Sequence, residues 1–558
     1  MSADAAGPPE RAAAPAPGDG AAATATAPPQ GLARSTAVMA VGTALSRVAG
    51  LGRLAAMAFA LGVAESRLAD SYNIANTLPN VLYELVLGGV LTSVFIPVLV
   101  EQLRTKSHDE AWDAVSTLVS SSLVVLVAVS ALAVLAAPWI VHLFSQRLSG
   151  TQAREQQALA TFFLRFFAPQ IALYGAAAIA GGILNAHGRF AVPMFAPILN
   201  NVVVIATFLL FAVVVSTSPT AASVNAHLGQ KLLLALGTTG GVAVMAAAHW
   251  PFLRGLPGRL RARVGFGHPA VRKLARLSAW TLGYVVTNQI GFGVSLYLAN
   301  AVQGGPTAYF TAFAFFQLPY GIVAVSIMTA LVPSLSAHHV DADDDSFRAR
   351  AAGGLRATAL LVLPATAAYL VLARPLVQVL LQHGVMRAGS ARLVASTLQM
   401  FAIGLLPFSA FLLFLRAFYA RQDARTPMLV NIVENVVTVS LDLLLFPHLD
   451  VRGLALAHSL GYVAGSALAG AVLARRVGGM ELARTLRALT KVVLATAAAA
   501  GAMVLVVVGA TTGLAPGTAR ATAQLLAGGA VGLGAFLVVA RALRVEDLDL
   551  LRRVLPRR

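Results

Sequence analysis

The sequence contains no cysteine, and only 11% of its 558 residues are charged. Without cysteine, disulfides, thiolate metal sites and c-type haem attachment are excluded. A soluble globular chain carries roughly a quarter charged residues, so water is the wrong solvent for most of this one. Because 58% of the residues are hydrophobic, the composition predicts an all-α integral membrane protein.

Motifs that bind nucleotides or activate water are missing as well. The chain has no Gly-x-x-x-x-Gly-Lys-Ser/Thr loop, no Gly-x-Ser-x-Gly elbow and no His-Glu-x-x-His pair. No soluble segment is long enough to bind ATP. We therefore expect no enzyme activity and no resident cofactor or metal, and we expect transport to draw on the membrane potential, substrate consumption or a gradient of Na⁺ or H⁺.

Apolar runs of about 20 residues predict about fourteen transmembrane helices. Interior prolines, such as Pro169 and Pro319, are expected to bend some of them. The predicted spans are 36–62, 69–102, 111–138, 157–183, 192–216, 230–252, 278–302, 306–336, 353–373, 391–415, 428–447, 453–474, 489–511 and 519–541.

The chain holds 41 Lys and Arg against 23 Asp and Glu. With the N-terminus inside, most of the basic residues fall in tails and inward loops, as the positive-inside rule requires. This favours a multi-pass inner (plasma) membrane protein with both termini cytoplasmic, and not a nucleic-acid binder. We predict a disordered cytoplasmic tail over 1–34 and a basic one over 546–558. The basic linker 255–276 is interpreted as a topology signal or as an amphipathic segment on anionic lipid.

An internal repeat divides the spans. The turn before the fifth span recurs 234 residues later, before the eleventh. Equivalent helices lie six apart, and six is even, so the halves are parallel: lobes over 35–254 and 277–480, with the helix pair in 481–545 outside the repeat. Such transporters bind substrate between the halves and rock in alternating access. The repeated residues are Ala186 and Ala420, Pro193 and Pro427, and Asn201 and Asn435.

Four charged residues in the first two spans are candidate substrate-binding residues. Arg47 and Arg53 lie too deep to snorkel easily, and guanidinium groups suit a diphosphate. Structural pairing with Asp70 or Glu84 is the alternative. Asp70 also fits a helix-dipole cap, and Glu84 is either a salt-bridge partner or a group that binds a proton.

A second polar stripe lies in the eleventh span, where Glu434, Asn435, Thr438 and Asp442 share one helix face. The oxygen atoms of Thr438 and Asp442 form a candidate Na⁺ site or proton relay. Polar packing between helices is the alternative. Arg165, among phenylalanines, is interpreted as an interfacial anchor.

Several motifs together resemble the MurJ (MviN) family of lipid II flippases, in the multidrug/oligosaccharidyl-lipid/polysaccharide exporter superfamily. The resemblance runs from about residue 35 to about 545, and the Ala-rich composition is similar to actinobacterial members. The motifs are Ser46-Arg47-Val48-Ala49-Gly50-Leu51-Gly52-Arg53, Leu78-Pro79-Asn80, Leu318-Pro319-Tyr320-Gly321, and Phe418-Tyr419-Ala420-Arg421-Gln422-Asp423 with Thr426-Pro427.

The resemblance implies two six-helix lobes, a final helix pair that forms a lipid-tail groove, and a cationic cavity for undecaprenyl-diphosphate-linked peptidoglycan precursor. It carries Arg47, Arg53 and Asp70 over as substrate-binding residues. It implies membrane lipids and cell-wall synthesis and division proteins as partners. Where Gram-negative members have further arginines, this chain has Tyr83-Glu84 and Ala314. A flippase for another undecaprenyl-linked glycan, a cation-coupled multidrug exporter and a non-transporting scaffold are the alternatives.

Overall fold

The computed structural model describes residues 30–83, 101, 107–215, 218–510 and 513–545, whose regular structure is entirely helical. The first lobe contains α1 (Gln30–Leu61), α2 (Leu68–Tyr83), α4 (His108–Phe144), α5 (Gly150–Phe167), α6 (Gln170–Ala186), α7 (Ala191–Val214), α8 (Ala221–Ala226), α9 (Leu228–Ala247) and α10 (Trp250–Arg254). The second contains α11 (Pro269–Ala299), α12 (Gly305–Pro319), η3 (Tyr320–Ala324), α13 (Val325–Val340), α14 (Asp344–Leu381), α15 (Ala388–Ile403), α16 (Leu405–Ala420), α17 (Arg425–Leu449) and α18 (Val451–Arg476). The final pair consists of α19 (Leu482–Leu505), continued by η4 (Val506–Ala510), and α20 (Thr518–Ala542).

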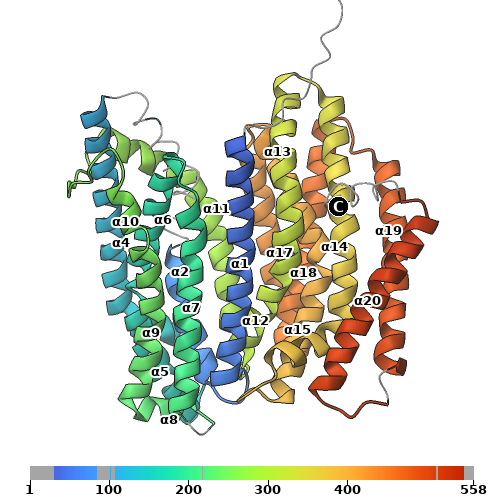
Figure 1. The fold of residues 1–558 in the computed structure, drawn as a ribbon, viewed down its shortest axis with the longest axis horizontal. Helices are drawn as coiled ribbons and strands as arrows, with labels where there is room; N and C mark the ends of the chain where they lie inside the picture. Colours follow the sequence, from blue (N-terminus) through green and yellow to red (C-terminus); the bar gives the residue numbers. More distant parts are fainter. Residues whose placement is uncertain (1–29, 84–100, 102–106, 216–217, 511–512, 546–558) are drawn as a thin grey trace, which may run out of the picture.

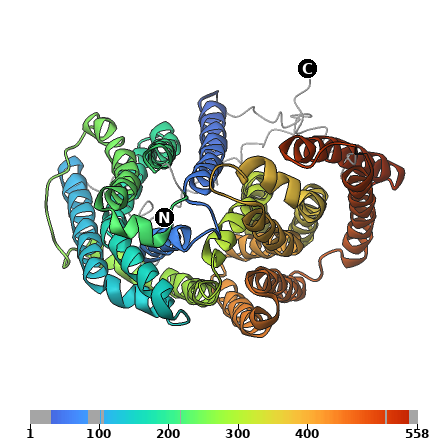
Figure 2. The same cartoon turned by 90° about the horizontal axis from the view of Figure 1, so that it is seen from below.

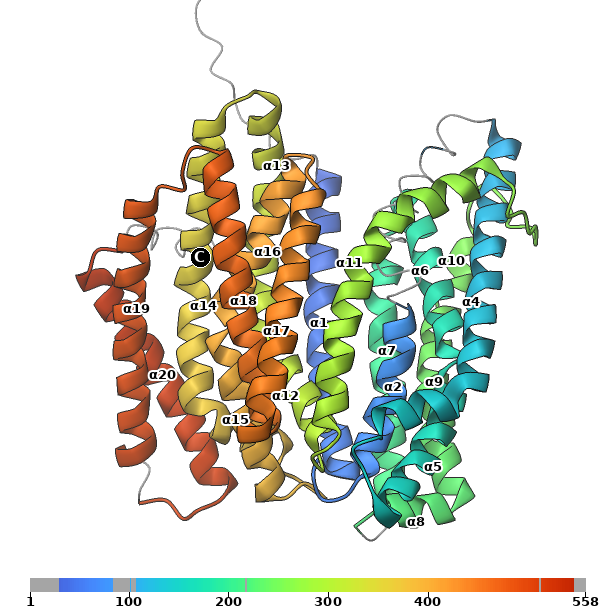
Figure 3. The ribbon, with the colours of Figure 1, turned by 180° about the vertical axis from the view of Figure 1, so that it is seen from behind.

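The helices form two bundles side by side, with α19 and α20 at the far edge of the second (Figure 1). From below, the three groups follow one another across the molecule (Figure 2). From behind, α11 crosses obliquely between the bundles (Figure 3), and it contacts both α4 and α17. We call the end where α1 begins the linker end, and the end where α1 leads into α2 the gate end.

Each bundle has its own aromatic core, as two separate lobes require. Phe163, Phe167 and Phe208 are fully buried in the first, and Phe316 and Phe401 in the second. Burying such side chains supplies most of the packing energy of a helical lobe. The predicted all-helical membrane fold with two lobes is confirmed.

Ten helical segments in the described residues are long and apolar enough to cross a membrane. An eleventh arises if α15 and α16, which meet at 47°, count as one span. Fourteen spans are compatible with the observed helices, but their number stays a prediction.

The internal repeat is visible in helix boundaries and in packing. Residue 234 positions after the end of α6 is the end of α16, and α7 and α17 begin at the same offset. Asn201 of α7 donates to the Ser46 carbonyl of α1 at 3.4 Å, and its equivalent Asn435 of α17 donates to Asn288 of α11 at 3.1 Å. Equivalent helices therefore pack in the same way in both lobes, which confirms the parallel repeat.

Two of the prolines expected to bend helices lie where helices are interrupted. Pro169 lies between α5 and α6, and Pro319 ends α12 immediately before the π-helical turn η3. Proline lacks the N–H that continues the α-helical ladder, and π-helical turns are frequent at functional sites. The bend between α15 and α16 is at Gly404, where a Cβ atom would approach the Ser459 Cα to 2.7 Å.

Two predicted boundaries were wrong. Helix α1 starts at Gln30, directly after Pro29, and so extends into the predicted tail 1–34; residues 1–29 and 546–558 lie outside the described residues. Helix α11 starts at Pro269, which shortens the linker to 255–268. Residues 255–268 are not helical, and both interpretations of the linker, a topology signal or an amphipathic segment on anionic lipid, stay predictions. The linker runs along α4, where hydroxyls of serines accept its backbone N–H groups at 3.1 Å.

The turn before α17, which is one of the two repeated turns, provides hydrogen-bond acceptors for the first N–H groups of that helix. Asp423 accepts from the backbone N–H groups of Arg425 and Thr426 at 2.9 and 3.0 Å, and Arg476 donates to its other oxygen. Partial burial alone would raise the pKa of Asp423, but hydrogen bonds from Thr426 and Arg476 lower it to about 2. A lowered pKa stabilises the fold above the unfolded value, and this contribution is lost only as pH falls toward 2.

The final helix pair is attached to α14. Both α19 and α20 pack on α14, around Leu372, Val492 and Phe536. Arg356, 7% exposed, donates to Glu481 at 2.9 Å at the start of α19. The pair therefore belongs to the outer side of the second lobe and adds a surface there without forming part of the repeat.

Candidate functional site

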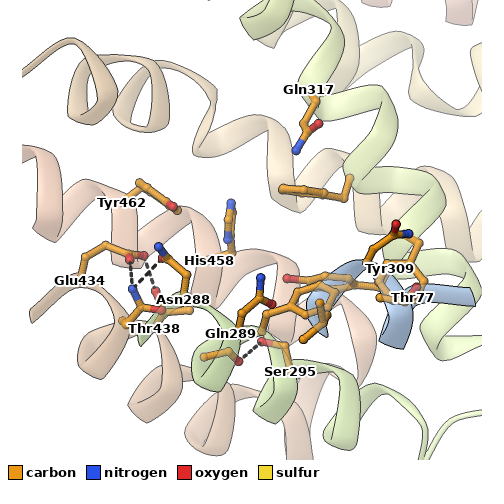
Figure 4. A pocket seen from close by; sticks show the side chains of 17 residues that line it. Thr77, Asn288, Gln289, Ser295, Tyr309, Gln317, Glu434, Thr438, His458 and Tyr462 are labelled. Carbon is orange, nitrogen blue, oxygen red and sulfur yellow. Dashed lines mark hydrogen bonds between the residues drawn. The ribbon is translucent and has the colours of Figure 1, made fainter. Parts of the chain in front are cut away.

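A cavity of about 390 Å³ lies where α2 faces the second lobe (Figure 4). Its size falls in the range of small-ligand sites. Five helices supply its walls, and polar side chains come from all of them. The polar residues are Thr77 and Asn80 of α2, Asn288, Gln289 and Ser295 of α11, Tyr309 and Gln317 of α12, Glu434, Asn435 and Thr438 of α17, and His458 and Tyr462 of α18.

Among the described residues that line this cavity, Glu434 is the one carboxylate. Its two oxygens accept from Thr438 at 2.9 Å and from Asn435 at 3.0 Å, and Asn435 also donates to Asn288 at 3.1 Å. The side chain is buried, and α18 approaches closely because Gly461 has no Cβ; one built there would lie 1.8 Å from the Thr438 hydroxyl. The predicted polar stripe of α17 thus faces the cavity and α11.

Asp442 lies one step further along the same stripe. It is fully buried, and Ser295 of α11 donates to one of its oxygens at 2.5 Å, while the other oxygen has no partner among the described residues. Thr438, predicted to share a cation with Asp442, instead contacts Glu434. An unpartnered buried carboxylate oxygen is costly, and it suits a proton or a cation with oxygen ligands.

His458 lies in an aromatic setting that the sequence did not reveal. The imidazole contacts the rings of Phe313, Phe316, Phe401, Phe408 and Tyr462. Its Nε2 atom is buried without a partner in the described part of the chain. A polar atom held in an apolar cage beside a cavity offers one directional hydrogen bond.

Arg47 of α1 points to the second lobe. A Cβ atom built on Gly321 of η3 would lie 2.4 Å from the guanidinium carbon, so the group lies against the backbone of the π-helical turn. Its Nε is buried and has no partner in the described residues. The Leu318-Pro319-Tyr320-Gly321 motif therefore creates room for a cation at the contact between the lobes.

Arg53 points to the first lobe, where the hydroxyl groups of Tyr72 and Tyr174 lie within electrostatic range. The six-residue spacing on α1 separates the two arginines by about 120°. The structure thus does not bring Arg47 and Arg53 together. It also does not pair either with Asp70, whose ion-pair partner is Arg67. Glu84, the other partner considered, lies outside the described residues.

Asp70, at the first turn of α2, joins the lobes at the gate end. Its carboxylate is fully buried and accepts from the Gly304 N–H at 2.7 Å and from the Thr307 hydroxyl at 2.8 Å. Asn73 donates to the same hydroxyl at 3.1 Å. Asp70–Gly304 and Asn73–Thr307 are each 234 positions apart, the repeat offset, so the equivalent helix starts α2 and α12 meet.

Neighbouring residues add further contacts at the gate end. Together with the Asp70 contacts, we call them the gate. Arg67 donates to the Asn300 carbonyl at 2.8 Å, and Gln303 donates to the Ala64 carbonyl at 2.9 Å. Glu65 accepts from the Ser390 hydroxyl at 2.6 Å. In this conformation the gate end is closed and Asp70 faces protein donors; its predicted contact with substrate stays a prediction.

The sequence interpretation missed the gate and the aromatic cage because their partners are far apart in the chain. Only the repeat offset could have paired Asp70 with Gly304. Glu84, also predicted as a site residue, lies outside the described residues.

Two parallel helical lobes, a polar cavity between them and closure at one end define a transporter of the alternating-access type. Comparisons with known proteins specify the class. The sequence model of the family described as "Lipid II flippase MurJ" matches residues 57–523. A lipid II flippase MurJ of Burkholderia cenocepacia is 30% identical over 76% of this chain and 80% of its own, and a probable one of Vibrio cholerae is 28% identical over 78% and 82%.

Solved structures agree at the level of fold. One described as lipid II flippase MurJ in an inward closed conformation covers 92% of this chain and 100% of its own, with a TM-score of 0.72 at 21% identity. An inward-facing multidrug MATE transporter covers 79% and 99%, with a TM-score of 0.63 at 13% identity. The chain belongs to the MurJ family of lipid II flippases and is a multi-pass membrane protein.

Proposed function

We propose that this chain moves lipid II, an undecaprenyl-diphosphate-linked peptidoglycan precursor, from the cytoplasmic to the outer leaflet. The family match over residues 57–523 carries the proposal. The chain works as a transporter, without a catalysed bond change. Substrate enters between the lobes from the linker end, and the lobes then rock so that it leaves at the gate end.

The protein lies in the inner (plasma) membrane. Its linker end and both termini are on the cytoplasmic side. The basic linker 255–268 at this end supports the orientation through the positive-inside rule. Arg47 and Arg53, both on α1 but directed toward different lobes, bind the diphosphate, and the lipid tail lies along the groove formed by α14, α19 and α20. Of these features, the groove is supported by the extensive packing of both final helices on α14.

Glu434 and Asp442 are proposed to carry the coupling charge, H⁺ or Na⁺. The support is geometric: both carboxylates are buried on one helix face, and one Asp442 oxygen lacks a partner in the described residues. Thr438 and Ser295 supply further oxygen atoms at 2.9 and 2.5 Å. Moving one charge across 100 mV is worth about 2.3 kcal/mol.

A leaflet assay tests the function. The assay uses cells in which this chain replaces the resident flippase. When the chain is depleted, we expect lipid II to become inaccessible to a membrane-impermeant probe at the outer surface and to accumulate on the inner side. Re-expression should restore access. Unchanged lipid II access, with another undecaprenyl glycan trapped inside, would instead identify a flippase for that glycan; no effect on either lipid would overturn the proposal.

Removing the buried carboxylate charges should uncouple transport. We expect Glu434→Gln and Asp442→Asn to reduce lipid II flipping about tenfold or more under a Na⁺ or pH gradient and to abolish its dependence on that gradient. Initial rates in proteoliposomes with imposed gradients measure this.

Asp450→Asn is the matched control, because this exposed carboxylate ends the same helix α17. It should keep both rate and gradient dependence. Full gradient dependence in the Glu434 and Asp442 variants would rule these residues out as the coupling site.

A further inference from the structure

A second cavity, of about 460 Å³, opens on the outer side of the first lobe near the gate end. It lies among α4, α5, α8 and α9 and is separate from the cavity between the lobes. Arg154, Arg165 and Lys231 line it, together with His142 and Asn225. The described residues that line it include no carboxylate.

The cations of this cavity are arranged along helix faces. Arg154 and Arg165 are eleven residues apart on α5, a spacing that returns to the same helix face after three turns. Lys231, at the start of α9, reaches the Asn225 amide oxygen at 3.3 Å and lies 4.9 Å from the centre of the Phe162 ring. Two helices, α5 and α9, therefore direct positive charge into one concave space.

None of these three cations forms an ion pair with a described residue. The nearest acidic neighbour in sequence, Glu155, points to another face of α5 and does not line the cavity. Unpaired cations near apolar surface are expensive. They are also unexpected here, because the positive-inside rule disfavours basic residues at the gate end, which the proposed topology places outside.

Two exposed apolar residues, here called the rim, are the sequence neighbours of two residues of α4 that line the cavity. Trp139 and Leu143 of α4 flank its Pro138 and His142 and are 82% and 54% exposed. Exposed tryptophan is typical of the boundary between lipid tails and headgroups. Cationic pockets between transmembrane helices with such a rim fit a phosphate headgroup while acyl chains lie on the adjacent helix surface.

We infer that this cavity binds the phosphate headgroup of an anionic phospholipid of the outer leaflet, with Arg154, Arg165 and Lys231 as its ligands. The site is distinct from the transport pathway. Because α4, α5 and α9 belong to the first lobe alone, a bound lipid would move with that lobe when the lobes rock.

Native mass spectrometry of the full chain tests this inference. The purified protein is mixed with phosphatidylglycerol or with zwitterionic phosphatidylcholine, and retained lipid is counted. We expect preferential retention of phosphatidylglycerol, and a loss of about tenfold or more in that preference in the R165Q/K231Q double variant. Both side chains are at least partly exposed, so their neutral replacements should leave the fold intact.

R392Q/R452Q is the matched control, because both are exposed cations at the gate end of the second lobe. It should retain phosphatidylglycerol as the wild type does. Equal loss in both double variants, or no preference in the wild type, would overturn the site. If the protein retained soluble glycerol phosphate as strongly as phosphatidylglycerol, the cavity would be assigned to a soluble phosphoester and not to a lipid headgroup. These outcomes are independent of lipid II flipping, which R165Q/K231Q should retain.

Discussion

Gly304→Ala is expected to prevent closure of the gate and to abolish flipping. Gly304 has φ +78°, and a Cβ atom on it would lie 2.3 Å from the Ala64 Cβ and 2.6 Å from the Ala64 Cα. The left-handed backbone costs alanine roughly 1–2 kcal/mol. The clash is with backbone of the other lobe, so rotating a side chain cannot relieve it. Separating the lobes relieves it, which breaks the Asp70 contacts.

Cysteine accessibility measures this result cleanly, because the chain has no cysteine of its own. Thr77→Cys places a thiol in the cavity between the lobes. An impermeant maleimide should label this thiol from the inner side in the otherwise wild-type protein and from the outer side in the Gly304→Ala background. Gly150→Ala is the control: its φ is +75°, but no atom lies within 4 Å of its built Cβ. Inner-side labelling in both backgrounds would contradict the role of Gly304.

Arg47→Ala should abolish rescue of a flippase-depleted strain at unchanged protein level. If Arg47 holds a diphosphate oxygen, losing a charge-assisted hydrogen bond of roughly 1.5–3 kcal/mol weakens substrate binding about 10- to 100-fold. Arg47→Lys should retain part of the activity, since it keeps the charge and loses the planar donor pair. Survival of the strain and binding of lipid II to purified protein are the two measurements.

Arg53→Ala should give the same phenotype through the first lobe, whereas Arg452→Ala, at an exposed position on α18, should behave as wild type. Full rescue by both the Arg47 and Arg53 alanine variants would remove these residues from the substrate site. Loss of protein in the membrane would instead identify a folding role.

Apolar runs were sufficient to predict a helical membrane fold, because a helix needs about 20 mostly apolar residues to cross the lipid. The internal repeat was sufficient to divide it into two lobes. The repeat turn predicted the equivalent starts of α7 and α17 correctly, since its proline and asparagine positions persist in both halves. Boundaries at Gln30 and Pro269 were misjudged because helix ends depend on local caps, which charge and composition do not reveal.

The site was harder to predict. A buried charge in a membrane helix indicates that a partner exists, but its identity depends on which helices meet. The sequence therefore did not reveal that Asp70 contacts Gly304 and Thr307, or that Thr438 contacts Glu434. The roles predicted for Asp70 and Thr438 stay predictions. The cluster of Arg154, Arg165 and Lys231 was not predicted, because Lys231 lies 66 residues after Arg165 in the chain.

The closed gate also determines where the lobes turn. Helix α1 contains 32 residues, and a helix of that length measures about 48 Å. While contacts around Asp70 hold one end together, a rotation of about 12° about them displaces the opposite end of such a helix by about 10 Å. The gate is therefore a pivot as well as a barrier. Opening it must transfer the axis of rotation to the other end of the molecule, so that the same small angle now parts the helices where Asp70 and Gly304 had met.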